Sequence, residues 1–403
     1  MIVKRIMPYL LSAMILAGAV TASAYFRKPV VMNIKATDNE AVPQREMRGL
    51  WVTYMSLDVE NEADKESAFE QRIDRIISDM KSTNLNTMFV QVRPFCDAMY
   101  RSAYFPWSHI LTGTQGKDPG FDPLRTICDK CAENDIRVHA WLNPYRVSTA
   151  QSPSELCADN PYMKDSSIGV EINGAKYLDP ANEKARDLIV NGVIELLENY
   201  DIDGVQFDDY FYPENCGDFD SSTYEEYKKS ASSPLSLSEF RKDNVNKLIK
   251  AVYKAAHSTR ADTVFGIAPQ GNLPNNDALY ADVRTWCRES GYIDYICPQL
   301  YFSLDNPALT FEDGLEQWLS LKKHSGLRLY VGIPAYKAGT DADGGTWLDN
   351  SDILKTEIEI IREKNCGGFL LYSSDSFRQK ESEQELSNVM RYLSSDSTTS
   401  PTQ

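Results

Sequence analysis

Hydrophobic positions along the chain alternate between two spacings, one of two residues and one of three to four. The first spacing predicts β-strands at 47–55, 86–94, 137–145, from about 202, and at 263–271, 293–302, 328–336 and 366–377. The second predicts helices at 67–84, 122–135, 182–200, 237–258, 278–291, 311–326, 351–365 and 383–393. Strands and helices therefore alternate regularly through most of the chain.

This alternation predicts a (β/α)8 TIM barrel over residues 46–393. The long connections follow the predicted strands two, three, four and seven, whereas short connections follow the helices. Barrels build their sites from loops at the carboxyl ends of the strands, so the unequal loop lengths place a site at that end. A doubly wound open sheet is the alternative, but the chain lacks the glycine-rich phosphate turn of that class.

The two ends of the chain differ from the predicted barrel. Residues 1–24 have Lys4 and Arg5 before an apolar run and end in Ala22-Ser23-Ala24, which predicts an export signal and a secreted or cell-envelope protein. An uncleaved anchor that tethers the protein to the membrane is the alternative, although the apolar run is shorter than the roughly 20 residues of a membrane span. Residues 25–45 are interpreted as a linker, and residues 394–403 as a disordered tail.

The stretch DIDGVQFDDYFYP at 201–213 carries the strongest chemical signal. Val205 and Phe207 alternate with Gln206 and Asp208, as in a strand, and Asp209 follows directly. Two acids at the end of an apolar strand are costly to bury without a function. A helix-capping role for one of them is disfavoured because Tyr-Phe-Tyr-Pro follows instead of a helix start.

The ends of the other predicted strands supply a polar and aromatic lining. Amides, aromatic rings and guanidinium groups of this kind suit a polyhydroxylated ligand, because rings stack on sugar faces and amides share hydrogen bonds with hydroxyls. The candidate substrate-binding residues are Arg93, Trp141, Asn143, Tyr145, Arg146, Tyr210, Gln270, Asn272, Gln299, Tyr301 and Tyr336.

Composition excludes several other classes. A formal charge of −16 without a basic stripe argues against a nucleic-acid partner. The chain has no GxSxG, HExxH or Walker motif, so no cofactor and no metal site is predicted. The eight cysteines have no disulfide-like spacing, and the pair Cys128 and Cys131 lies in a helical pattern, which predicts mostly buried free thiols.

Several long motifs resemble glycosyl-hydrolase-like family ten. They are QVRPFCDAMYRSAYFPWSHILTGTQGKDPGFDPL (91–124), VHAWLNPYRV (138–147), YLDP (177–180), DGVQFDDYFYP (203–213), APQGN (268–272) and IDYICPQLYF (293–302). The resemblance covers about 45–393 and implies a barrel enzyme exported to the bacterial envelope. Members characterised as enzymes hydrolyse glycan strands of peptidoglycan stripped of their peptides. Many relatives carry His where this chain has Gln206.

Glycoside hydrolysis usually requires two carboxyl groups. Asp208 is the first candidate because it shares a strand face with Gln206. By strand parity Asp209 is expected to point the other way, towards Arg93 or Arg146. The second carboxyl is then expected from Asp97, from Asp209 turned by a bulge, or from Asp375, in that order.

The sequence thus predicts an exported glycoside hydrolase that acts on a cell-envelope or extracellular polysaccharide. The alternative is a non-catalytic glycan-binding barrel, which would need aromatic rings but only one carboxylate near the strand-four end. A metal-dependent hydrolase would require His near Asp208 and Asp209, and the sequence places none there.

Overall fold

The computed structural model describes residues 46–395. The predicted export signal at 1–24 and the linker at 25–45 lie outside the described residues, as does the predicted tail beyond residue 395. Within the described part of the chain, no helix is both long and apolar enough to cross a membrane.

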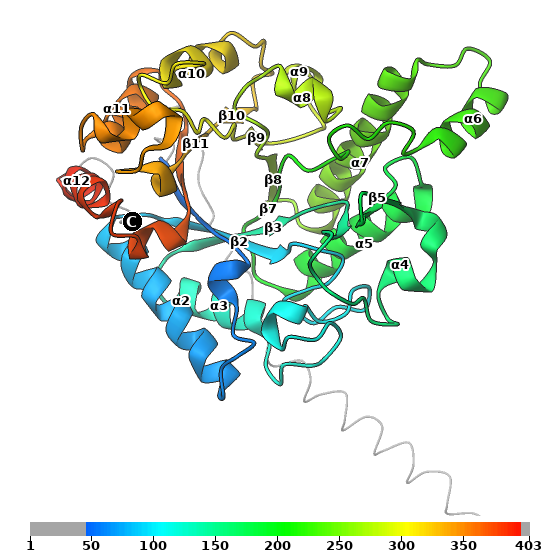
Figure 1. The fold of residues 1–403 in the computed structure, drawn as a ribbon, viewed down its shortest axis with the longest axis horizontal. Helices are drawn as coiled ribbons and strands as arrows, with labels where there is room; N and C mark the ends of the chain where they lie inside the picture. The colour runs from blue at the N-terminus through cyan, green and yellow to red at the C-terminus, as the bar shows by residue number, and fades with distance from the viewer. Residues whose placement is uncertain (1–45, 396–403) are drawn as a thin grey trace, which may run out of the picture. The chain divides into compact units, whose positions relative to one another are not determined.

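A parallel sheet forms the centre of the fold (Figure 1). Its strands, in spatial order, are β10 (Arg328–Leu329), β9 (Tyr295–Ile296), β8 (Val264–Ile267), β7 (Gly204–Phe207), β3 (Arg137–Leu142), β2 (Thr87–Arg93), β1 (Met47–Val52), β12 (Gly368–Tyr372) and β11 (Val331–Ile333). Only Tyr330 separates β10 from β11, so these two of the nine strands are halves of one broken strand. Because β10 pairs with β9 and β11 with β12, the sheet closes into an eight-stranded barrel, which confirms the predicted fold.

A helix follows each barrel strand in the chain. These helices are α2 (Lys65–Ser82), α3 (Pro123–Ala132), α5 (Glu183–Asn199), α7 (Leu237–Thr259), α9 (Val283–Arg288), α10 (Phe311–Leu319), α11 (Ile353–Glu363) and α12 (Glu383–Ser394). Side-chain oxygens of Asp64, Asp122 and Asn182 accept backbone N–H groups at the starts of α2, α3 and α5. Local capping therefore sets several helix boundaries of the barrel.

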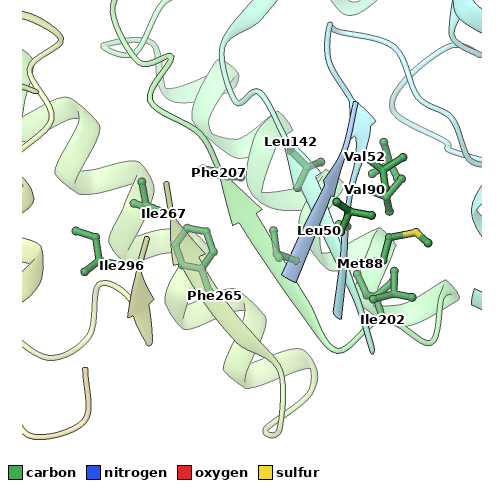
Figure 2. Packing of buried hydrophobic residues seen from close by; sticks show 14 of the residues in the cluster. Leu50, Val52, Met88, Val90, Leu142, Ile202, Phe207, Phe265, Ile267 and Ile296 are labelled. Atoms are coloured by element: carbon green, nitrogen blue, oxygen red, sulfur yellow. The ribbon is translucent and has the colours of Figure 1, made fainter. Parts of the chain in front are cut away.

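Alternate residues of the strands divide between two hydrophobic layers. Leu50, Val52, Met88 and Val90 belong to the larger layer between strands and helices (Figure 2). Their neighbours in sequence, among them Trp51 and Phe89, pack in a second cluster inside the barrel with Trp141, Tyr295 and Tyr330. This division follows from the two-residue period of a strand, and it fixes which side chains point along the barrel axis.

Glycine makes room for the large rings inside the barrel. A Cβ atom at Gly266 would lie 2.2 Å from the ring of Tyr295, closer than any real contact. At Gly204 it would lie 2.6 Å from the ring of His139. The barrel interior is thus filled by aromatic side chains on some strands that face glycines on their neighbours.

Additional elements lie in the loops at the carboxyl ends of the strands. The loop after β3 forms a small antiparallel sheet of β4 (Arg146–Ser148), β6 (Ala175–Leu178) and β5 (Gly169–Ile172), with the short helix α4 (Pro161–Lys164). The loops after β7 and β8 contain α6 (Ser221–Ser230) and α8 (Asn275–Ala278). The short 3₁₀ helices are η1 (Met55–Leu57), η2 (His109–Leu111), η3 (Ser166–Ile168), η4 (Ala335–Lys337), η5 (Ala342–Leu348) and η6 (Ser374–Arg378).

The sequence overestimated two helices. The helix expected at 278–291 is α9, which begins only at Val283, after Asp282 accepts a hydrogen bond from Thr285 N. The helix expected at 311–326 ends at Leu319. Apolar residues continue at helical spacing beyond these limits because the adjoining loops also pack on the core.

All eight cysteines are free thiols. Six are buried, and the side chains of Cys157 and Cys366 are half-buried. Burial raises the pKa of the Cys128 thiol to about 12. The CxxC pair Cys128 and Cys131 lies on the buried side of α3, as the helical pattern predicted.

A carboxyl group without a hydrogen-bond partner among the described residues lies on the buried face of α11. Glu357 is fully buried and both its oxygens are unpaired. Burial, and then the nearby charge of Glu385, raise the pKa of Glu357 well above its usual range. An acid whose pKa is raised by folding favours the folded state at low pH, and this contribution is lost as the pH rises from the unfolded-state pKa to the folded-state pKa.

We therefore expect Glu357→Gln to stabilise the protein at pH 8 by at least about 1 kcal/mol and to have a smaller effect at pH 5. The neutral amide keeps the shape and removes a charge that is costly to bury. Urea unfolding at both pH values measures the difference, and Glu363→Gln at the exposed end of α11 is the control. A Glu357→Gln protein that is less stable than the wild type at pH 8 would contradict this reading of Glu357.

Candidate active site

Asp208 follows the last residue of β7 and is held by groups from β3 and its following loop. Its Oδ2 accepts a hydrogen bond from Trp141 Nε1 at 3.1 Å and another from Asn143 Nδ2. Its Oδ1 accepts one from the backbone N–H of Tyr210 at 3.2 Å. The carboxyl group is only 3 % exposed, so these donors fix its position at the floor of the barrel mouth.

A second row of contacts holds Asn143 in turn. Gln91 Nε2 donates to Asn143 Oδ1 at 2.7 Å, and Gln91 Oε1 accepts from the backbone N–H of Tyr54 at 3.2 Å. The amides therefore link β1, β2 and β3 to Asp208. Asn143 is fully buried, so its role is to position Asp208 rather than to meet a ligand.

Asp209 faces the opposite neighbours of β7. Its Oδ1 accepts a hydrogen bond from Gln299 Nε2 at 3.2 Å, and Gln270 also hydrogen-bonds to this carboxyl group. Gln270 and Gln299 follow β8 and β9, and a β-bridge joins them. Strand parity correctly separated Asp208 from Asp209, but the partners of Asp209 are these two amides instead of Arg93 or Arg146.

The pairing of β7 is regular up to Phe207, so Asp208 keeps the face that the alternation predicted. Gln206, two residues earlier, accepts a hydrogen bond from Trp51 Nε1 at 2.6 Å inside the barrel. The register shift of this region lies in β2 instead, between Gln91 and Arg93.

Electrostatics couple the two acids, which we call the acid pair. Burial, and then the negative charge of Asp209, raise the pKa of Asp208 to about 7. Burial also raises the pKa of Asp209, and the charge of Glu214 adds to this. Since two close carboxylates resist ionising together, the negative charge of Asp209 favours the protonated form of Asp208.

Arg146 lies beside Asp208. Its Nε donates to Pro94 O at 2.8 Å, and its guanidinium group lies over the rings of Phe95 and Tyr210, at 4.8 and 5.4 Å from their centroids. Its positive charge is the largest influence that lowers the pKa of Asp208. The ring of Tyr210 remains 53 % exposed.

Three further tyrosines cluster at the mouth. Tyr301, Tyr336 and Tyr372 contact one another with ring centroids 5.5–6.0 Å apart. Tyr336 is 37 % exposed, and the other two side chains are half-buried. The ring planes are inclined to one another by 37–81°, and each ring on its own offers a face on which a sugar could stack.

A cavity of about 280 Å³ reaches Tyr210 and Gln270, which adjoin the acid pair, although neither acid lines it. Its polar and aromatic lining comes from Asn173, Tyr177, Tyr210, Glu214 and Gln270. The hairpin of β5 and β6 forms one wall, and the segment after β7 forms another.

The structure buries three of the predicted site residues, of which Arg93 still interacts electrostatically with Asp208. Asp97 is fully buried and accepts hydrogen bonds from Gln115 at 2.9 Å and, at 3.0 Å, pairs with His109. Arg93 is 1 % exposed and lies over Phe105, and Tyr145 is fully buried. Direct contact of these side chains with a substrate does not fit their positions, because the long loops after β2 and β3 cover them.

The other predicted residues lie at the mouth or directly support it. Trp141, Asn143, Arg146 and Tyr210 surround Asp208, Gln270 and Gln299 hold Asp209, and Tyr301 and Tyr336 belong to the tyrosine cluster. Asn272 is half-buried, and its carbonyl oxygen accepts a hydrogen bond from Asn276 at 3.3 Å.

Glu214 was missed by the sequence analysis because it does not end a strand. The sequence does contain a signal for the hairpin that forms the opposite wall of the cavity. Asn173-Gly174, between two β-rich segments, is a typical hairpin turn. Both residues have positive φ, 52° and 78°. Among residues 46–395, no group of three or more His, Cys, Asp or Glu side chains is arranged to hold a metal ion.

The closed barrel has a polar, aromatic mouth at the carboxyl ends of its strands, as in a (β/α)8 enzyme, and similarity to known proteins identifies its family. A family model described as glycosyl hydrolase-like 10 matches residues 46–348. The chain belongs to this family, as its motifs indicated.

Curated relatives carry related names. The chain is 34% identical to "Glycosyl hydrolase YngK" of Bacillus subtilis, over 80% of this chain and 68% of that protein. It is 29% identical to "Glycosyl hydrolase DigH" of Escherichia coli, over 85% of this chain and 86% of that protein. Both relatives are thus named as glycosyl hydrolases.

Solved structures show the same fold. The glycoside hydrolase domain of PgaB (BpsB) from Bordetella bronchiseptica aligns with a TM-score of 0.55 at 12% identity, over 85% of this chain and 99% of that chain. An α-L-fucosidase from Paenibacillus thiaminolyticus aligns with a TM-score of 0.53 at 11% identity, over 86% of this chain and 49% of that chain. At these identities the likeness concerns the fold alone.

Proposed function

We propose that this protein is an exported enzyme that hydrolyses O-glycosidic bonds of a cell-envelope polysaccharide, and that its substrate is the peptide-free glycan strand of peptidoglycan. The observation that carries the proposal is the buried acid pair at the end of β7, fixed by amide and indole donors and surrounded by tyrosine rings. Membership of the glycosyl hydrolase-like family and the names of the relatives support the same reaction class.

The chemistry follows from one proton shared by two acids. A protonated carboxyl group gives its proton to the glycosidic oxygen, while the ionised partner stabilises the developing positive charge at the anomeric carbon or activates water. The leaving sugar departs with the proton, the hydroxyl of water ends on the anomeric carbon, and the remaining proton of the water returns to the carboxyl pair. We assign these two forms to Asp208 and Asp209. Their carboxyl groups face opposite neighbours of β7, so the assignment requires each to approach the glycosidic bond from a different side of the mouth.

Incubation with peptide-free peptidoglycan strands and with a panel of other polysaccharides tests this function. New reducing ends, identified by mass spectrometry of the products, are the expected result. Binding of strands without cleavage would favour a non-catalytic glycan-binding barrel. Cleavage of another polysaccharide would show that the proposed substrate is wrong but that the protein is a glycoside hydrolase. Sequencing of the protein from its host tests export, with a mature amino terminus expected near Tyr25.

The acid pair also predicts a pH dependence. We expect kcat/KM to fall as the pH rises through about 7, because the shared proton is then lost from the pair whose member Asp208 has its pKa raised to about that value. Initial rates between pH 4 and 9 measure the profile, and thermal unfolding at each pH controls for stability. A rate that still rises between pH 7 and 9 would contradict the need for a protonated carboxyl group.

A further inference from the structure

Two oppositely charged side chains flank the acid pair. The positive charge of Arg146 lowers the pKa of Asp208, whereas the negative charge of Glu214 raises the pKa of Asp209. Glu214 lines the cavity beside the pair, and Arg146 does not. Tyr210 connects the two groups, because its ring lies under the guanidinium group of Arg146 and also lines the cavity of Glu214. Neighbouring sugars bound along Tyr210 would therefore meet a positive group at one site and a negative group at the next.

Arg146 is arranged to receive an anion. Its Nε is occupied by Pro94 O, and two aromatic rings restrict the guanidinium plane. Its Nη1 and Nη2 atoms make no hydrogen bond within residues 46–395, and the side chain is half-buried. A planar fork with free donors suits bidentate binding of a carboxylate.

The cavity on the other side suits an uncharged sugar. The Glu214 carboxylate repels an anionic substituent and accepts hydrogen bonds from hydroxyl groups. Ile172, Ala175 and Leu279 add an apolar surface for the methyl group of an acetamido substituent. Tyr177 and Tyr210 supply ring faces on which a sugar can stack.

The proposed substrate has the matching alternation. In a peptide-free peptidoglycan strand, every second sugar carries a lactyl ether, and removal of the peptide frees its carboxylate. The sugars between are neutral N-acetylated hexosamines. Strands that keep their peptides lack this free carboxylate on every second sugar.

We propose that Arg146 binds the freed lactyl carboxylate and that the Glu214 cavity takes the neighbouring neutral N-acetylhexosamine. The strand then binds in a single register, and only one of its two alternating kinds of glycosidic bond is cleaved. This inference rests on the proposed function and deepens it, because it predicts a preference for strands whose peptides have been removed.

Capping the carboxylates tests the role of Arg146. Peptide-free strands are compared with the same strands after conversion of their lactyl carboxylates to methylamides. Arg146→Met should raise KM on native strands roughly 10–100-fold, as expected for loss of a charge-assisted pair, and should leave KM on capped strands unchanged. Arg146→Lys should retain part of the effect, and Arg328→Met, an exposed arginine at the start of β10, is the matched control.

The register is tested by the products. Borohydride reduction and mass spectrometry should find one kind of reducing-end sugar with the wild-type protein, and both kinds with the double variant Arg146→Met and Glu214→Gln. An equal mixture of the two reducing-end sugars from the wild type would overturn the inference. An equal rise in KM on native and capped strands with Arg146→Met would also overturn it. Either result would leave the proposed function standing. Failure of the wild type to cleave either strand would instead overturn the proposed function itself.

Discussion

Asp208→Asn should abolish glycan cleavage, with a loss on the order of 10³-fold or more in kcat. Asparagine keeps the shape of the side chain and can still accept hydrogen bonds from Trp141 and Asn143 through its carbonyl oxygen. It can neither donate a proton as an acid nor carry the charge that stabilises an oxocarbenium-like transition state. The loss therefore concerns the chemical step, and glycan binding should remain.

The measurement is kcat on a verified substrate, together with strand binding and thermal unfolding. Asp201→Asn is a matched control, because Asp201 precedes the other end of β7 and its side chain is 96% exposed. Asp209→Asn should also lower the rate and should move the fall in activity to lower pH, since the negative charge of Asp209 no longer helps to raise the pKa of Asp208. Equal activity of Asp208→Asn and the wild type would contradict the catalytic role of Asp208 and favour the interpretation as a glycan-binding barrel.

Arg241→Met should destabilise the protein by about 3–5 kcal/mol. Arg241 lies on α7, and its Nη2 contacts Asp220 Oδ1 at 2.6 Å, with side-chain exposures of 3% and 0%. It also donates to Gly217 O at 2.6 Å and to Tyr280 at 2.8 Å. Removal of the cation leaves the carboxylate of Asp220 buried without its countercharge.

The loss of stability should mainly affect the segment that leads from the acid pair to α6. Urea unfolding measures the loss, and adding Asp220→Asn to Arg241→Met should recover part of it because the orphaned charge is removed. A single variant within about 1 kcal/mol of the wild type, or a double variant no more stable than the single one, would show that this buried pair does not anchor the segment.

Much of the barrel could be predicted because its strands are buried on both faces and its helices on one. The alternation around Gln206 and Asp208 placed Asp208 at the mouth, and the structure keeps that parity to the end of β7. Strand ends also identified Asn143, Gln270 and Gln299, because in a barrel these ends converge on one face. Local sequence therefore sufficed for residues whose position depends on the strand alone.

Other parts depend on how the long loops return over the barrel. The periodicity of hydrophobic residues does not show how deeply a side chain is buried. Asp97, Arg93 and Tyr145 were therefore expected to line the site, although the long loops bury them. Glu214 approaches Asp209 only because the chain turns after Tyr212, and the opposite cavity wall comes from a hairpin about 40 residues earlier. Such juxtapositions arise from tertiary packing and leave no signal in spacing.

The buried thiols make local unfolding of the protein measurable by chemical labelling. Alkylation and disulfide exchange require the thiolate, and burial at Cys96, Cys128 and Cys287 holds each thiol pKa at about 12. A reagent that modifies only exposed thiolates therefore reaches these sites when the surrounding element unfolds. The labelling rate at Cys128 would report on α3, and the rate at Cys287 on α9. In an oxidising compartment, rapid burial would likewise protect the nascent chain from mispaired disulfides.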